Sequence, residues 1–351
     1  SSLDWQPPFG RLGKTKLCVD EARNWWEGKR ILAYPHNIGN THWASVVFEK
    51  APTSRDPSHV VLLMGDVLNP RIWAKWLDGT DVVASPRQIL RKQVTALADA
   101  GMVAMVGTEL EFVVFHDTYE EAWNKAYRDL TPVNLYNVDY SIMGGSRIEP
   151  LLRTIRLGMA GAGMTVESVK GECNFGQHEI AFKYSDALSN CDNHVIYKNG
   201  AKEIASQEGY ALTFMAKPNQ KEGNSSHIHC SFRGLDGSMV MADDKDKEHG
   251  LSDVGRSFIA GQIAHLKEIS LLFAPNINSY KRYVPGSFAP TAIAWGRDNR
   301  TCALRLVGHG GSLRLENRVP GGDVNPYLAV AGIIAAGLDG INRKLKLEDA
   351  F

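Results

Sequence analysis

Thr108-Glu109-Leu110-Glu111-Phe112 lies inside an apolar stretch, residues 103–115, that predicts a β-strand. Side chains in a strand alternate between two faces, so Glu109 and Glu111 share one face while Leu110 and Phe112 share the other. Adjacent like charges on one side of an apolar strand are costly unless a cation or water neutralises them. The stretch therefore indicates a core strand whose second face is wet and charged.

Two further predicted strands repeat this arrangement at distant points in the chain. In His227-Ile228-His229-Cys230-Ser231-Phe232, the two histidines and the serine share a face. In Arg314-Leu315-Glu316-Asn317-Arg318, both arginines and the glutamate do so. Each strand thus offers a polar face that carries metal-ligand or phosphate-binding groups. The economical interpretation is that the three faces line one cavity.

A fourth element adds two carboxylates on either side of a glycine turn. It reads Gly171-Glu172-Cys173-Asn174-Phe175-Gly176-Gln177-His178-Glu179, and an apolar strand begins at Glu179. Carboxylate oxygens with a histidine suit hard cations such as Mg²⁺ or Mn²⁺. Too few thiolates or histidines accompany them for a zinc site. The set predicted to hold metal is Glu109, Glu111, Glu172, Glu179, Glu316 and His227.

Each of these motifs alone has a more ordinary interpretation. A lone Glu-x-Glu in a strand is usually a solvated edge, and a lone His-x-His is more often an exposed face than a ligand pair. An Arg-x-Glu-x-Arg strand is most often a surface ladder of ion pairs. The stretch 308–312 is read as a flexible turn, with closure over a ligand as the alternative. Only convergence of the motifs in space would favour a shared site.

The rest of the chain alternates predicted helices and strands without a repeat, which indicates an α+β fold. Residues 1–80 carry six of the eight tryptophans and show no clear period. Ser85 followed by Pro86 predicts a helix start, and Gly101 can end that helix. A further strand is expected over 211–217. The other expected helices are 147–159, 194–208, 253–273 and one opened by Pro326.

Composition removes several classes of function. The 351 residues carry 39 basic and 39 acidic side chains, without the basic excess of a nucleic-acid-binding protein. The chain has no apolar run long enough to cross a membrane, and its start does not resemble a signal peptide. P-loop and Gly-x-Ser-x-Gly motifs are absent. Five scattered cysteines without a Cys-x-x-Cys pair predict a reducing, cytoplasmic setting.

Six motifs in this order resemble glutamine synthetase, over residues 84 to about 340. They are the stretches 108–112, 172–179, 223–229, 278–286, 299–305 and 314–328. The resemblance implies a small β-grasp domain over 1–83 and a catalytic domain over 84–351. In that domain an antiparallel sheet forms an active-site funnel at a subunit boundary. It also implies a homo-oligomer, a dodecamer of two hexameric rings, and further helices beyond Phe351.

The same resemblance implies roles for individual residues. Glu111, Glu172 and Glu179 match the ligands of a first metal ion. Glu109, His227 and Glu316 match those of a second, so two Mg²⁺ or Mn²⁺ ions are expected in each site. The backbone of Gly223 and the side chains of Arg282 and Arg318 match groups that hold glutamate. Arg300, Arg305, His229 and Ser231 match positions that contact ATP, and Arg282, Arg300 and Arg305 are the expected catalytic residues.

Phe288 is the most informative departure from the family pattern. True glutamine synthetases carry a glutamate there, and that carboxylate binds ammonium and accepts its proton. Phenylalanine offers only apolar area or a weak cation–π contact. Residues 286–290 with 295–300 look more like the γ-glutamylpolyamine and γ-glutamylethanolamide synthetase branch. We therefore expect ATP-dependent joining of an organic amine to the γ-carboxylate of glutamate. The alternatives are glutamine synthetase itself and an inactive metabolite sensor.

Overall fold

A computed structural model describes residues 31–37, 43–50, 60–66, 73–76 and 83–351. The chain divides into two compact units, Ser1–Gln88 and Ile89–Phe351. The first unit contains a four-stranded antiparallel sheet in chain order, built from β1 (Ile31–Asn37), β2 (Trp43–Lys50), β3 (Val60–Asp66) and β4 (Trp73–Trp76). The β-grasp assignment and the boundary at residue 83 remain predictions.

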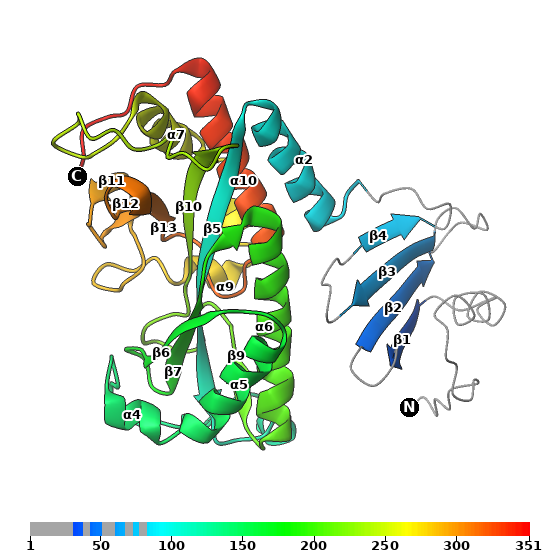
Figure 1. Cartoon of the computed structure of the whole chain (residues 1–351). Helices are drawn as coiled ribbons and strands as arrows, with labels where there is room; N and C mark the ends of the chain where they lie inside the picture. Colours follow the sequence, from blue (N-terminus) through cyan, green and yellow to red (C-terminus); the bar gives the residue numbers. More distant parts are fainter. Residues whose placement is uncertain (1–30, 38–42, 51–59, 67–72, 77–82) are drawn as a thin grey trace. The chain divides into compact units, whose positions relative to one another are not determined.

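The second unit is built on a nine-stranded sheet (Figure 1). Its main path runs in the order β11-β12-β13-β10-β5-β7-β6, and β8 and β9 pair with β5. The strands are β5 (Met102–Phe115), β6 (Val166–Gly171), β7 (Gln177–Phe182), β8 (Ser185–Asp186), β9 (Ala211–Thr213), β10 (Ser226–Gly234), β11 (Ala292–Arg297), β12 (Cys302–Val307) and β13 (Arg314–Asn317).

The sheet is mixed, which corrects the prediction of an antiparallel one. Strands β11 and β12 pair in parallel, with Ala292 opposite Cys302, while the other pairs are antiparallel. The short link between them therefore has to run back along β11 before β12 begins. Asp298, the first residue of this link, has a φ of 51° in the left-handed region, and its backbone N–H still donates to the carbonyl of Leu306 in β12.

The helices largely follow the expected spacing. They are α2 (Pro86–Asp99), α3 (Tyr119–Asn124), α4 (Ile142–Ser146), α5 (Glu149–Gly161), α6 (Ala187–Gln207), α7 (Asp253–His265), α8 (Ser270–Phe273), α9 (Ile277–Tyr280) and α10 (Pro326–Arg343). Helix α6 begins seven residues before the predicted start at 194, because the Asp186 side chain caps it by accepting a hydrogen bond from the backbone of Ser189.

Two other predictions are wrong in extent. The helix expected over 253–273 is interrupted after His265, where Leu266 bonds to Ile263 in a tighter, three-residue turn. The strand expected over 211–217 ends at Thr213. Beyond it the side-chain amide of Asn224 donates to the carbonyls of Thr213 and Met215, at 3.2 and 2.9 Å, in place of a neighbouring strand.

Helices cover one side of the sheet and bury its apolar side chains in two clusters. One cluster joins α5 and α6 to β5 and includes Phe112, Ile155 and Tyr197. The other joins α7 and α10 to β10 and includes Phe232 and Phe258. Helices α6 and α10 lie next to each other in Figure 1. The predicted alternation in β5 is confirmed around the two glutamates: Leu110 and Phe112 are buried on one face, and Glu109 and Glu111 share the other.

Glycines let α7 and α10 approach closely. A Cβ atom on Gly261 of α7 would lie 2.1 Å from the carbonyl oxygen of Ala336 in α10, far inside van der Waals contact.

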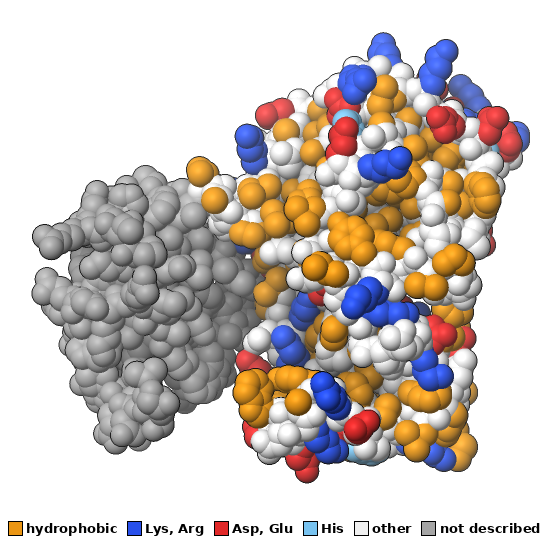
Figure 2. Space-filling view, turned by 180° about the vertical axis from the view of Figure 1, so that it is seen from behind, with side chains coloured by type: hydrophobic (Ala, Val, Ile, Leu, Met, Phe, Trp, Pro, Cys, Tyr) orange, Lys and Arg blue, Asp and Glu red, His pale blue; other side chains and the backbone are white. Residues whose placement is uncertain are grey.

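Among the described residues, no helix is long and apolar enough to span a membrane. On the face seen in Figure 2, basic and acidic side chains are scattered among hydrophobic ones.

Candidate active site

Strand register aligns the polar side chains in rows across the sheet. In one row Glu111 of β5 lies opposite Glu179 of β7, which lies opposite Lys170 of β6. In the next row Glu109 lies opposite His227 of β10. Because facing residues of an antiparallel pair have neighbouring Cβ atoms, side chains from three strands meet in the first row and from two strands in the second.

A third row continues the site towards the edge of the sheet. His229 of β10 lies opposite Glu316 of β13, which lies opposite Arg305 of β12. The three charged strands read from the sequence therefore do converge, and the surface-edge interpretation of each motif is wrong. The sheet brings together groups that lie far apart in the chain, from β5 to β13.

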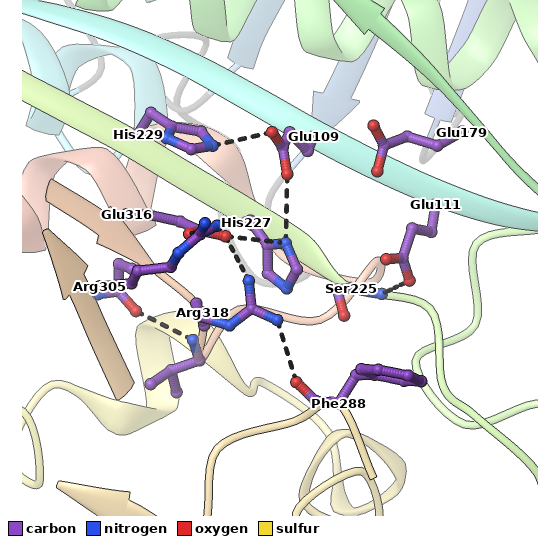
Figure 3. A network of polar contacts seen from close by, with 12 residues as sticks. Glu109, Glu111, Glu179, Ser225, His227, His229, Phe288, Arg305, Glu316 and Arg318 are labelled. Atoms are coloured by element: carbon purple, nitrogen blue, oxygen red, sulfur yellow. Dashed lines mark hydrogen bonds and ion pairs between the residues drawn. The ribbon is translucent and has the colours of Figure 1, made fainter. Parts of the chain in front are cut away.

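Glu109 stands at the centre of a network of histidines and carboxylates (Figure 3). Its carboxylate oxygens lie 3.3 Å from Nδ1 of His227 and 3.0 Å from Nε2 of His229. Nδ1 of His227 also lies 3.4 Å from Glu316. Burial alone would raise the pKa of Glu109, but the two histidine hydrogen bonds outweigh it and hold that pKa well below its usual range. Glu109 is therefore an anion in this site.

Crowded carboxylates line the neighbouring part of the site. Burial, and then the charge of Glu179, raises the pKa of Glu111 to about 7. Burial and a neighbouring carboxylate also raise the pKa values of Glu172 and Glu179 to about 7. Oε2 of Glu111 accepts a 2.6 Å hydrogen bond from the backbone N–H of Ser225, which fixes its direction (Figure 3). Such mutual repulsion is relieved when a divalent cation enters.

The arginines fall into two groups. Arg318 and Arg305 pair with Glu316, which is 1% exposed, and Arg318 also donates to the carbonyl of Phe288 at 3.3 Å. Arg282 is equally buried but donates to the carbonyl of Val319 and the hydroxyl of Ser225, both at 2.8 Å. Within the described part of the chain it forms no salt bridge. Its charge is thus available to an anionic ligand.

Two adjoining cavities accommodate the predicted residues, and Glu109 lines both. The smaller, about 140 Å³, is lined by the predicted metal, glutamate and phosphate groups, including the exposed Arg300. The larger, about 320 Å³, is lined by His229 and Ser231. The predicted residues that line the smaller cavity are Glu109, Glu111, Glu172, Glu179, Gly223, His227, Arg282, Phe288, Arg300, Arg305, Glu316 and Arg318.

Gly223 lies in a tightly packed part of the smaller cavity, whereas Phe288 lies in an exposed part of its wall. A Cβ atom on Gly223 would lie 2.4 Å from the carbonyl oxygen of Ala216 and 2.7 Å from Cγ of Arg282, so the backbone there requires glycine. Phe288 is 53% exposed, and its neighbour Ser287 holds the turn by donating to the carbonyls of Val284 and Arg282. The Phe288 ring therefore forms an apolar part of the cavity wall that is open to solvent.

The donor atoms fit hard divalent cations. Glu109, His229 and Glu316 each offer a ligand atom, and these atoms lie within 4.8 Å of one another. His227 lies between the same two carboxylates, and its buried Nε2 has no hydrogen-bond partner among the described residues. Either histidine can therefore complete this set, although only His227 was predicted to bind metal. Glu111, Glu172 and Glu179 share the cavity without approaching as closely.

Several site residues were not predicted from the sequence. Lys170 lies 3.0 Å from Glu179 and 3.5 Å from Glu172. Gln177 donates from Nε2 to Glu111 at 3.1 Å and to the carbonyl of Gly223 at 2.9 Å. Both residues stand two positions before a predicted ligand, on the same face of a strand or its end. That spacing was the signal available.

The comparisons with known proteins agree with this fold and site. Residues 83–351 match the family model described as glutamine synthetase, catalytic domain. The mixed sheet with its carboxylate and arginine rows lies within the part of the chain that this catalytic-domain model matches. The chain belongs to the glutamine synthetase family.

Its relatives include ligases named for organic amines as well as glutamine synthetases. The chain is 66% identical over 274 residues to γ-glutamylethanolamide synthetase GlnA4 of Streptomyces coelicolor, covering 78% of this chain and 58% of that protein. It is 39% identical over 275 residues to a glutamate–isopropylamine ligase of a Pseudomonas species, covering 78% and 60%. The solved structure of a GmaS/ADP complex matches with a TM-score of 0.72 and 26% identity, over 94% of this chain and 76% of that one. The chain thus spans about three-fifths of the length of these curated relatives.

Proposed function

We propose that the protein joins an organic amine to the γ-carboxylate of glutamate, using ATP, through a γ-glutamyl phosphate. The observation that carries this proposal is the pair of adjoining cavities that meet at Glu109. The larger, bordered by His229 and Ser231, would take ATP. The smaller, with its buried arginines, would take glutamate, so the γ-phosphate and the carboxylate meet where the acidic and basic side chains gather.

The binding groups follow from the contacts of the smaller cavity. Arg282, buried and without a salt bridge to a described residue, would hold a carboxylate of glutamate beside the backbone of Gly223. Arg318 would assist from its position between Glu316 and Phe288. Arginine forks match the geometry of carboxylates and phosphates. Two Mg²⁺ or Mn²⁺ ions would be held, one by Glu111, Glu172 and Glu179 and the other by Glu109, His227 and Glu316.

The chemistry then takes two steps. A γ-carboxylate oxygen attacks the γ-phosphorus of ATP, and ADP leaves. The amine nitrogen attacks the acyl carbon, the bond to phosphate breaks, and the departing phosphate carries away the amine proton. Bound divalent cations would screen the repulsion between the two anions in the first step. Arg300 and Arg305 would stabilise the transferring phosphoryl group, because both line the cavity and Arg305 is fixed by Glu316 and Asp298.

Phe288 supports an organic acceptor over ammonium. Its ring offers apolar contact at the cavity wall and no charge to attract a small cation. The 66% identity to a γ-glutamylethanolamide synthetase makes ethanolamine the first acceptor to test. We also propose that the active assembly is a dodecamer in the cytoplasm, as the family resemblance implies. Glutamine synthesis from ammonium and an inactive sensor remain the competing functions.

The test is phosphate release from ATP with glutamate and Mg²⁺, across ammonium, ethanolamine, isopropylamine, putrescine and spermidine. Mass spectrometry would identify each γ-glutamyl product. We expect one organic amine to exceed ammonium in kcat/KM by at least about tenfold. A preference for ammonium would support glutamine synthesis. ATP binding without phosphate release from any amine would support the sensor.

A further inference from the structure

Lys170 lies at the position where the proposed function requires a metal ion. Its Nζ atom lies 3.0 Å from Glu179 and 3.5 Å from Glu172, two of the three carboxylates expected to hold the first cation. The third, Glu111, faces Glu179 across β5 and β7. Glu111 and Glu179 point to the same side of the sheet in Figure 3. The ammonium group therefore lies among these carboxylates, and we call the part of the cavity formed by Glu111, Glu172 and Glu179 the acidic corner.

Strand pairing holds the lysine there. Lys170 of β6 is directly opposite Glu179 of β7 in the antiparallel ladder, so its side chain must project on the same face. The Nζ atom also lies 5.4 Å from the ring centre of Tyr140, which lines the same cavity. This ring provides a second favourable environment for the ammonium group. A four-carbon side chain can move between the two without any change in the backbone.

Among the described residues, the other cations of the cavity form no ion pair with Glu172 or Glu179. Arg305 and Arg318 pair with Glu316, and Arg282 donates to neutral oxygens. Within the described residues, Lys170 is thus the cation that forms ion pairs with Glu172 and Glu179. Without it, Glu172 and Glu179 would have no ion-pair partner among the described residues.

We propose that Lys170 is a tethered counter-ion of the first metal site: its ammonium group neutralises Glu172 and Glu179 in the metal-free protein and is displaced towards Tyr140 when a divalent cation binds. This inference rests on the proposed two-metal function and assigns a role to a residue outside the predicted ligand set. The lysine stabilises the acidic corner while it is empty of metal. It also weakens cation binding at that site, since one positive charge must leave before another enters.

The test is a Mn²⁺ titration of the full chain, followed by the electron paramagnetic resonance signal of free Mn²⁺, on wild type and Lys170→Gln. We expect one class of site to bind Mn²⁺ about tenfold more tightly in Lys170→Gln, with the second class unchanged within about threefold. Lys170→Arg keeps the charge and should behave as wild type. Lys202→Gln removes a charge from the exposed surface of α6 and is the matched control.

Melting temperature provides an independent readout. In EDTA, Lys170→Gln should melt several degrees below wild type, and Mn²⁺ should raise its melting temperature more than that of wild type. Mn²⁺ affinity that is unchanged or weaker in Lys170→Gln would overturn the inference and leave the proposed ligation intact. Absence of any Mn²⁺ binding in wild type would overturn both this inference and the two-metal part of the proposed function.

Discussion

Restoring a carboxylate at position 288 should shift the acceptor preference towards ammonium. Phe288→Glu places a negative charge on the wall of the smaller cavity, where the Phe288 side chain is more than half exposed. The bond from Arg318 reaches the carbonyl of residue 288 and does not depend on its side chain. The turn is held by Ser287 through backbone carbonyls. We therefore expect the substitution to change stability by less than about 1 kcal/mol.

The size of the effect follows from the charge and its exposure. A carboxylate and an ammonium ion about 4 Å apart attract by about 4 kcal/mol at an effective dielectric constant near 20. Because residue 288 is 53% exposed, water and salt screen more than half of this. About 1–2 kcal/mol remains, which corresponds to roughly 5- to 30-fold in kcat/KM for ammonium.

The assay is phosphate release with ammonium and with ethanolamine, measured for wild type, Phe288→Glu and Phe288→Gln. The glutamine variant matches the size of glutamate without its charge, so it separates electrostatics from the loss of the ring. We expect kcat/KM for ammonium to rise only in Phe288→Glu. Ethanolamine, which is also a cation but loses the apolar contact of the ring in both variants, should gain less from the charge. If both variants raise kcat/KM for ammonium equally, or neither raises it by more than about threefold, the reasoning about Phe288 is wrong.

Three further predictions concern the packing and charge of the catalytic unit. Gly223→Ala should cost about 1–3 kcal/mol in denaturant unfolding and abolish activity, because the new methyl group would lie 2.4 Å from a backbone carbonyl oxygen; unchanged stability would contradict this close approach. Glu316→Ala should lower the free energy of unfolding by about 3 kcal/mol, because it leaves buried Arg318 unpaired. In a double-mutant cycle, adding Arg318→Ala should recover part of that loss. Strictly additive effects would argue against the pair. Hydrogen bonds from His265 to Glu268 and Asp339 raise the pKa of His265. Its contribution of about 0.5–1 kcal/mol to the free energy of unfolding should therefore be full below pH 6.5 and disappear as pH rises through the raised pKa. The same pH dependence of unfolding in His265→Gln would refute this.

The charged faces of the site could be predicted because a period of two is a local property of the chain. Glu109 and Glu111 share a face whatever pairs with their strand, and the same holds for His227 and His229. Which rows they form depends on register between strands distant in sequence. Lys170 is paired with Glu179 by such a register, which the spacing of Lys170 from Glu172 in the sequence does not predict.

The errors in the fold have the same origin. The amide of Asn224 ends the ladder at Thr213, and the interruption after His265 depends on a change of hydrogen bonding within an apolar run. The parallel pairing of β11 with β12 differs from the antiparallel sheet that the family resemblance implied. In the first two cases, hydrogen bonding outside the expected element overrode the local preference on which the prediction relied.

The cross-strand rows have a consequence for the order of folding. The groups expected to hold cations come from β5, β7, β10, β13 and the turn between β6 and β7, so they are brought together only after strands from distant parts of the chain have paired. Such non-local pairing forms late in folding, because the chain must lose loop-closure entropy before the contacts between distant strands can stabilise it. A cation bound to these rows would therefore recognise the completed sheet alone. It would lower the unfolding rate constant while leaving the folding rate constant unchanged, and so stabilise the native state kinetically.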